Sequence, residues 1–407
     1  MNVLFLSLDY VVPADRGLRV RSLSQLQVLA SVDAVEHVTF LSLSEAPVSA
    51  DRLAALERML PKVRAETPVL QPTHMRRSPR HLPRLLRLRL RGLPYLVAKS
   101  DNAAMRALIE RHLAARRYDV IYVGHIGMMA YLAGMKRLAP HARVVLEEHN
   151  VEWEIFDRLA PSFRFPLRAA ARLEARALRG YERRALRAVD AVIAISDADA
   201  GAFEKLSGVR ATVVPTFIQS GAKRVERTQA PALAYTGLLA WQPNAHGLDW
   251  FCKDVWPLVR ARMPDATLSI AGPGLRTDPS GALIVPLAWQ QPGVSTVGYV
   301  KDLEDLYAGS VAMIAPIIGG SGVRMKLLES MRAGMPTVTT TDGAAGLDVK
   351  DGREMFVADT PAAFAEGVVR LLTDPALRDR FRDAGYAYLE GHHSLAVARK
   401  RLEPVLS

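Results

Sequence analysis

The residues with the clearest chemical character follow a glycine-rich turn in the second half of the chain. Arg324 and Lys326 follow within four residues of the turn Gly319–Gly322, and Glu329 lies one helical turn further on. Glycines let the backbone approach a ligand closely, and the N-terminus of a helix presents free N–H groups to an anion. Cations in the first turn of a helix oppose its dipole unless an anion compensates them. The pattern therefore predicts a phosphate site, beside a carboxylate that accepts hydrogen bonds from sugar or ribose hydroxyls.

Two histidines in the first half follow short apolar runs. His125 comes after the run at 120–123. The run at 144–146 is followed by Glu147 and then by Glu148, His149 and Asn150. Side chains at the carboxyl ends of parallel strands line the ligand crevice of an α/β sheet, so both groups are candidates for a site. A hydrogen-bonded structural role remains equally open for either histidine.

These residues need a scaffold, and the apolar runs supply its pattern. The runs lie at Val3–Leu8, Val38–Leu43, Val120–Val123, Val144–Leu146, Ala191–Ile195, Ala232–Thr236, Thr267–Ala271, Val311–Ala315 and Thr337–Thr341. Stretches of helix length separate them, which is the rhythm of a doubly wound parallel sheet. The polar segment Phe217–Pro231 divides the series and is predicted to be a linker. The fold class is therefore α/β, with two Rossmann-like domains facing each other across a ligand-binding cleft.

Composition excludes several classes of protein. The chain of 407 residues has no apolar run of the about 18 residues that a transmembrane helix needs. Its N-terminus lacks the basic and hydrophobic regions of a secretory signal. The single cysteine, Cys252, excludes an intramolecular disulfide and a zinc site with several cysteines. Together these features predict a cytoplasmic protein.

The net charge of +11 arises entirely within residues 1–220. This excess predicts an anionic partner for the first half. Nucleic acid is not the expected partner, because few aromatic residues that could stack on bases are interleaved with the basic ones. Within 80–93, four leucines and four arginines fall on opposite faces of a predicted helix. Such a helix either contacts the inner face of an anionic membrane or packs its leucines on the core, and both interpretations remain open. A second arginine-rich stretch, 164–187, is expected to form a long solvated helix.

Several segments together resemble one enzyme family. The stretch Gly319–Pro336 with Gly343–Leu347 resembles the C-terminal domain of retaining GT-B glycosyltransferases of group 1, family 4. Further matches lie at Tyr235–Gly237, Trp241–Asn244, Pro264–Gly272, Gly298–Leu303, Tyr181–Glu182 and Asp190–Ser196. Each match is short, but in this order they cover nearly the whole chain. The turn with Arg324 and Lys326 is similar to that of members linked to exopolysaccharide assembly.

The resemblance implies a UDP-, GDP- or dTDP-sugar donor, held by a C-terminal domain over 218–389. Arg324 and Lys326 would bind its pyrophosphate and stabilise the departing nucleoside diphosphate, while Glu329 would hold donor hydroxyls. His125 would contact the donor sugar. The other implied donor-binding residues are Gly237, Val300, Gly320, Ser321, Gly322 and Val323. The transfer would retain the anomeric configuration and would need neither a metal nor a cofactor beyond the nucleotide-sugar substrate.

The resemblance assigns the acceptor to an N-terminal domain over 1–217, to which a C-terminal helix over 390–407 returns. The acceptor would be a hydroxyl, with lipid-linked and polysaccharide precursors both open. Its candidate ligands are Gly17, Arg19, Glu148, His149 and Asn150. Around Gly17, Arg16, Arg19 and Arg21 either contact an acceptor phosphate or are solvated charges at the start of a helix.

The chain departs from the family pattern at two points. Ser321 replaces the first glutamate of the E-x7-E motif, whose second glutamate is Glu329, and the loop Gly237–Asn244 lacks the usual arginine and lysine. Arg324 and Lys326 would then neutralise the donor phosphates alone. Two alternatives remain open: an epimerase of the same fold, and a non-catalytic protein that binds polyanions or membranes through its basic half.

Overall fold

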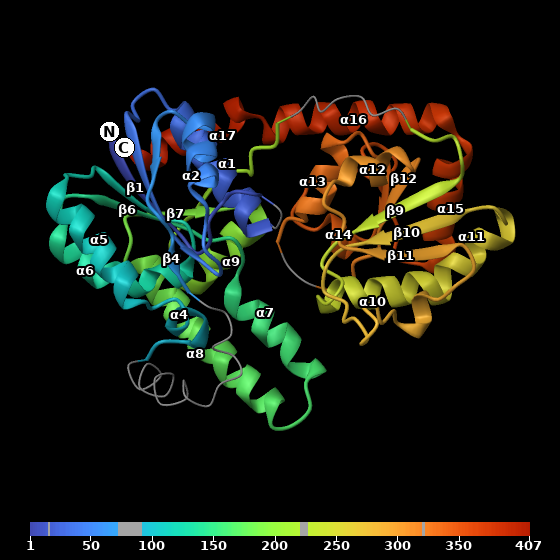
Figure 1. The fold of residues 1–407 in the computed structure, drawn as a ribbon, viewed down its shortest axis with the longest axis horizontal. Helices are drawn as coiled ribbons and strands as arrows, with labels where there is room; N and C mark the ends of the chain where they lie inside the picture. The colour runs from blue at the N-terminus through green and yellow to red at the C-terminus, as the bar shows by residue number, and fades with distance from the viewer. Residues whose placement is uncertain (15–16, 72–91, 220–226, 320–321) are drawn as a thin grey trace. The chain divides into compact units, whose positions relative to one another are not determined.

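The computed structural model describes residues 1–14, 17–71, 92–219, 227–319 and 322–407. The chain divides into two compact units (Figure 1). Unit 1 comprises Met1–Phe217 and Leu395–Ser407, and unit 2 comprises Ile218–Ser394. The return to unit 1 therefore begins at Leu395, not at residue 390 as predicted, because the preceding helix α16 continues to His393 in unit 2.

Unit 1 is built on an eight-stranded parallel sheet with the order β3-β2-β1-β5-β6-β7-β8, and β4 pairs with β2. The strands are β1 (Asn2–Ser7), β2 (His37–Ser44), β3 (Val63–Ala65), β4 (Val69–Leu70), β5 (Val120–Val123), β6 (Arg143–Glu147), β7 (Ala191–Ala194) and β8 (Thr212–Val213). Alternate residues of β1 enter different cores: Leu4 and Leu6 on one face, Val3 and Phe5 on the other. Burial of both faces explains why these strands are continuously apolar.

Helices cover both faces of this sheet (Figure 1). They are α1 (Gly17–Ser31), α2 (Ala50–Met59), α4 (Tyr95–Ala98), α5 (Ala103–Ala115), α6 (Leu132–Leu138), α7 (Glu152–Leu159), α8 (Leu167–Arg187), α9 (Asp197–Ser207) and α17 (Leu395–Leu406), with 3-10 turns at Ile126–Tyr131 and Ala160–Ser162. Local capping fixes two starts: Asn102 accepts from the N–H groups of α5, and Ser196 from that of Asp199 in α9. Helix α17 adds Leu402 and Val405 to the core beneath β1 and α1.

Unit 2 repeats the architecture with a six-stranded parallel sheet in the order β11-β10-β9-β12-β13-β14. The strands are β9 (Ala232–Thr236), β10 (Thr267–Ala271), β11 (Val294–Gly298), β12 (Ala312–Ala315), β13 (Thr337–Thr339) and β14 (Phe356–Val357). The helices are α10 (Gln242–Trp250), a π-helical turn (Phe251–Val255), α11 (Trp256–Arg262), α12 (Leu303–Ala308), α13 (Met325–Arg332), α14 (Thr341–Ala344), α15 (Pro361–Thr373) and α16 (Pro375–His393), with a 3-10 turn at Leu287–Trp289. Strand β12 again divides its side chains, with Ile314 in one core and Met313 in the other.

Two parallel α/β sheets, each covered by helices on both faces, confirm the predicted fold class. In both sheets a late strand returns to pair with the first strand of the unit, β5 with β1 and β12 with β9. Such a reversal of strand order is a topological switch point, where ligands of α/β sheets bind beyond the carboxyl ends of the strands. Each unit therefore places candidate ligand contacts at one defined edge.

Candidate functional site

In unit 2, the switch point brings the glycine turn to the end of the first strand. Strands β9 and β12 are hydrogen-bonded neighbours, so the loop after Thr236 and the turn before α13 leave the same edge of the sheet. Gly319 and Gly322 have φ angles of 77° and 79°, in the left-handed region that glycine adopts without strain. The turn thus delivers Arg324 at the start of α13, as the sequence predicts, with Lys326 in its first turn.

Lys326 is held entirely by uncharged partners. Its Nζ donates to the Tyr235 hydroxyl at 3.1 Å and to Asn244 Oδ1 at 2.9 Å, and it lies 4.4 Å from the centroid of the Tyr235 ring. No carboxylate among the described residues lies within ion-pair distance of it. Burial, with the nearby positive charge of Arg324, lowers the pKa of Lys326 to about 7, although Glu329 opposes the shift. An ammonium group in this setting gains from an anion more than a solvated lysine would.

Arg324 lies beside Lys326 and is 6% exposed. Its guanidinium carbon is 5.4 Å from the centroid of the Trp241 ring. One terminal nitrogen donates long hydrogen bonds to the carbonyl oxygens of Gly319, at 3.4 Å, and Asp342, at 3.5 Å. The Asp342 carboxylate in turn accepts from the Gly319 N–H at 2.6 Å. The glycine turn, the arginine and the start of α14 thus form one connected structure.

Gly237 lies in close contact with Lys326 and with the two side chains that hold it. A Cβ there would lie 2.7 Å from Lys326 Nζ, and 3.0 Å from both Asn244 Nδ2 and the Tyr235 hydroxyl. We expect Gly237→Ala to displace the ammonium group and to weaken nucleoside diphosphate binding by about tenfold, the loss of one charge-assisted hydrogen bond. Isothermal titration measures this. Gly201→Ala, in α9 with nothing within 4 Å, is the matched control and should bind normally.

Three of the other predicted donor residues lie near the same edge of the unit 2 sheet, and two lie outside the described residues. Glu329 is on α13, one turn after Lys326, and burial raises the pKa of its carboxyl. Val323 packs on the core of α13, and Val300 follows the end of β11. Gly320 and Ser321 lie outside the described residues.

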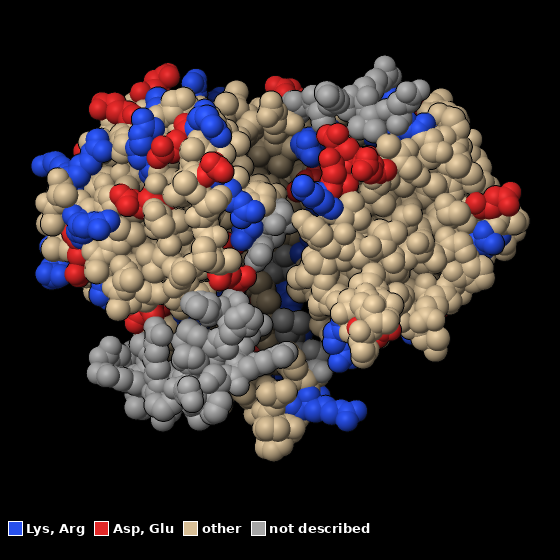
Figure 2. Space-filling view, in the orientation of Figure 1, with Lys and Arg blue, Asp and Glu red and all other residues tan. Residues whose placement is uncertain are grey.

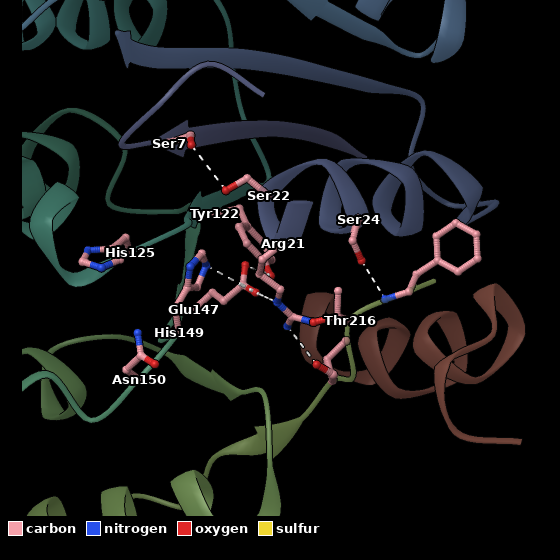
Figure 3. A network of polar contacts seen from close by, with 12 residues as sticks. Ser7, Arg21, Ser22, Ser24, Tyr122, His125, Glu147, His149, Asn150 and Thr216 are labelled. Carbon is pink, nitrogen blue, oxygen red and sulfur yellow. Dashed lines mark hydrogen bonds and ion pairs between the residues drawn. The ribbon is translucent and has the colours of Figure 1, made fainter. Parts of the chain in front are cut away.

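In unit 1, a buried polar network lies at the carboxyl ends of β5 and β6 (Figure 3). Arg21 of α1 points at Glu147, the last residue of β6, and their side chains form an ion pair that is almost fully buried. Arg21 also donates to Thr216 Oγ1 at 3.1 Å and to the Val214 carbonyl at 2.8 Å, and Glu147 accepts from the Tyr122 hydroxyl at 2.9 Å. Burial alone would raise the pKa of Glu147, but Arg21, with smaller contributions from neighbouring donors, holds it below its ordinary value.

This network corrects one expectation. Arg21 is neither a solvated charge nor an acceptor ligand, because every nitrogen of its guanidinium bonds within unit 1. Arg19 is likewise held in place, by Asp9 at 2.7 Å, and Gly17 begins α1. Arg16 lies outside the described residues. An acceptor role for Gly17 and Arg19 stays a prediction.

His125 is fixed by bonds at both ring nitrogens. Its Nδ1 accepts from the Gly127 N–H at 3.0 Å, so the proton sits on Nε2, which faces Glu152 Oε1 at 3.2 Å. Its ring meets that of His149 edge to face, with centroids 5.6 Å apart. The sugar contact assigned to His125 stays a prediction, since a ligand would have to share the Nε2 proton with Glu152.

The group Glu148, His149 and Asn150 is more enclosed than the sequence suggests. Glu148 is fully buried, and burial together with Glu182 and Glu152 raises its pKa well above the ordinary value. Glu182 caps the start of α7 through the Glu152 N–H, and burial raises its pKa to about 8. His149 is buried, and burial lowers its pKa. Asn150 is partly exposed, so it is the member of the group most accessible to an acceptor.

In the described part of the chain, no helix is long and apolar enough to cross a membrane. This part also contains no group of three or more His, Cys, Asp or Glu side chains that could hold a metal ion. The predicted membrane helix at 80–93 lies, up to residue 91, outside the described residues.

Comparisons with known proteins agree with this organisation. Residues 49–220 match the family described as Glycosyltransferase Family 4, and residues 230–374 the family described as Glycosyl transferases group 1. A 44.6 kDa protein in the cps region of Klebsiella pneumoniae is 28% identical over 140 residues, which are 33% of this chain and 35% of that protein. The chain thus matches about a third of the length of this curated relative.

Solved structures of low sequence identity share the fold over the full chain. HepE of Anabaena, in complex with UDP and glucose, has a TM-score of 0.64 at 14% identity, covering 100% of this chain and 99% of that chain. TarM of S. aureus, in a complex that includes alpha-GlcNAc-glycerol and UDP, has a TM-score of 0.70 at 10% identity, with coverage of 100% and 99%. Sucrose-phosphate synthase of Thermosynechococcus elongatus has a TM-score of 0.67 at 15% identity, with coverage of 100% and 98%. Residues 49–220 and 230–374 thus match a family 4 and a group 1 glycosyltransferase domain in this order, and the chain shares the GT-B fold of these solved structures.

Proposed function

We propose that the enzyme transfers a sugar from a UDP-sugar to a hydroxyl acceptor with retention of configuration and without a metal ion. The observation that carries the proposal is Lys326, a desolvated cation with neutral partners, beside Arg324 at the start of α13. UDP is the preferred diphosphate because HepE and TarM are described in complex with it. A polysaccharide precursor on a lipid carrier is the proposed acceptor.

The two cations act where charge develops. As the bond between the anomeric carbon and the diphosphate oxygen breaks, negative charge grows on the leaving phosphate, and Arg324 and Lys326 stabilise it. The acceptor oxygen attacks the anomeric carbon from the same face, and its proton passes to the departing phosphate oxygen. That proton needs no separate general base, and Lys326 and Arg324 provide the charge that a metal ion would otherwise supply.

A binding panel tests the donor class directly. UDP, GDP, dTDP and CMP are titrated with and without magnesium, and we expect UDP to bind most tightly and magnesium to leave its affinity unchanged. NMR of the product from UDP-α-sugars should show an α-glycoside. Tighter binding of GDP than of UDP would overturn the choice of base. A product of inverted configuration would overturn the retaining mechanism. If no nucleotide bound, the proposal as a whole would be wrong.

The lowered pKa of Lys326 predicts how UDP affinity depends on pH. Below about pH 7 the free protein already carries the ammonium proton, whereas above it that proton must be taken up on binding. Affinity should therefore be lost as pH rises above 7, by up to tenfold per pH unit, with net proton uptake in calorimetry. Lys326→Arg keeps the charge throughout and should flatten the profile. An equally steep profile in that variant would assign the titration to another group.

A further inference from the structure

The hairpin of α7 and α8 in unit 1 ends far from any core. The two helices pack side by side and extend together away from the sheet (Figure 1). The base of the hairpin is anchored, since Trp153 and Phe156 pack on the core and the Arg179 guanidinium lies 5.1 Å from the centroid of the Trp153 ring. All buried residues of α8 lie from Glu174 onward. Its first two turns and the connection before them therefore gain no stability from core packing.

This end of the hairpin, residues 161–176, is here called the tip. It exposes large apolar side chains in close succession: Phe163 is 39% exposed, Phe165 86% and Leu167 63%. The projecting end of the hairpin is visible in the space-filling view (Figure 2). Single exposed apolar residues are common on protein surfaces, but a contiguous group of them marks an interaction site.

The tip is also strongly basic. Arg164, Arg168, Arg172 and Arg176 recur every four residues and are all exposed, and the one acidic residue of the tip, Glu174, is buried. Within the described part of the chain, none of these four arginines forms an ion pair. Arg168 donates to the carbonyl oxygens of Phe163, at 2.9 Å, and Pro161, at 3.0 Å, and so holds the turn in shape. The tip thus exposes aromatic and aliphatic side chains beside arginines whose charge no carboxylate of the described residues neutralises.

We propose that the tip docks the enzyme on an anionic membrane surface. Phenylalanine and leucine side chains enter the boundary between headgroups and acyl chains, while the arginines pair with lipid phosphates. A stable protein interface takes about 20–30 residues from each side, which is more than the tip provides. A lipid surface adapts to such a convex shape. This surface contrasts with the expectation that 164–187 forms only a solvated helix.

Vesicle sedimentation of the full chain tests the proposal. Wild-type protein should bind vesicles of phosphatidylcholine with about 30% phosphatidylglycerol and should bind pure phosphatidylcholine much less. The double variant Phe165→Ser/Leu167→Ser should lose at least about tenfold in partition coefficient, and Arg164→Gln/Arg172→Gln about fivefold per arginine on the anionic vesicles. Leu287→Ser, at an 82% exposed leucine of unit 2, is the matched control and should bind like wild type.

A fluorescent label reports where the tip inserts. Cys252 is fully buried, and burial raises the pKa of its thiol to about 12, so a new cysteine at the exposed position Ala169→Cys can be labelled selectively. A polarity-sensitive dye there should shift to shorter wavelength with anionic vesicles and be quenched by brominated lipids. The same dye on Leu287→Cys should do neither.

Three results would overturn the proposal. Undiminished vesicle binding by the tip variants would assign the binding to another basic part of the chain. No binding of the wild type to anionic vesicles would exclude a membrane role. Self-association that is lost in Phe165→Ser/Leu167→Ser, without vesicle binding, would assign the tip to a second copy of the chain. UDP affinity should be unchanged in every variant, so that failure of the tip proposal is distinguishable from failure of the proposed function.

Discussion

Replacing Lys326 with alanine is expected to lower the transfer rate by about 10²–10³-fold, the usual cost of removing one group that stabilises developing negative charge. The effect is large because Lys326 is poorly solvated and has only neutral partners, the Tyr235 hydroxyl and Asn244. Arg324→Ala should have an effect of the same order, since its guanidinium lies at the same helix start. Initial rates of sugar transfer from the UDP-sugar measure both effects. Lys253→Ala, at an exposed lysine of the same unit, should leave the rate unchanged.

Stability separates this loss of rate from loss of fold. The pKa of Lys326 is near 7 in the folded protein and near 10.5 in the unfolded chain. Between these values the unfolded state binds more protons, so this group makes the wild type more stable as pH rises and less stable toward pH 7. Lys326→Met lacks that titration. Its melting temperature relative to wild type should therefore be highest at or below pH 7 and should decline toward pH 10. An inactive Lys326→Met that melts lower at pH 7 than at pH 10, relative to wild type, would contradict the assigned pKa.

The site around Lys326 shows how much of a site can be predicted from a sequence pattern. The glycine turn and the helix that begins at Met325 follow from local signals, because glycines, charges and apolar spacing act within a few residues. The contact of Lys326 with Tyr235 and Asn244 joins residues 91 and 82 positions apart, and only the pairing of β12 with β9 creates it. Tyr235 and Asn244 occur in the segments that resemble the family, but nothing local in them indicates that they hold the lysine.

The buried network in unit 1 is a clearer case of contacts that a sequence pattern does not predict. Arg21 and Glu147 are 126 residues apart, and Arg21 stands among other arginines that suggest a solvated cluster. One signal was present: Glu147 directly follows the apolar run of β6, where a buried carboxylate needs a cation or a hydrogen-bond donor. Which cation pairs with Glu147 depends on how α1 packs beside the ends of β5 and β6. Periodicity predicts that a helix buries one face, but it does not show which arginine of a cluster is the buried one.

We expect Arg21→Met to lower the free energy of unfolding of unit 1 by about 3–5 kcal/mol, because it breaks the buried ion pair with Glu147. The variant leaves Glu147 fully buried without its cation, and it removes the hydrogen bonds that Arg21 donates to Thr216 and to the Val214 carbonyl. Denaturant unfolding followed by near-UV circular dichroism measures the change. Arg158→Met removes an exposed pair with Glu154 and should change stability by less than about 1 kcal/mol. Arg21→Met/Glu147→Gln should recover part of the loss, because it removes the unpaired charge.

The pH dependence of this variant decides whether the buried charge is the cause. In the wild type Arg21 holds the pKa of Glu147 below its ordinary value, so the contribution of the pair to stability is present at neutral pH and is lost only as pH falls through that lowered pKa. Without Arg21, burial dominates and raises the folded-state pKa above the unfolded value. The folded variant then binds more protons, so its stability should fall as pH rises, and the deficit against wild type should be larger at pH 7 than at pH 5. An equal deficit at both values would show that Arg21→Met acts through lost packing of α1 and not through an uncompensated carboxylate.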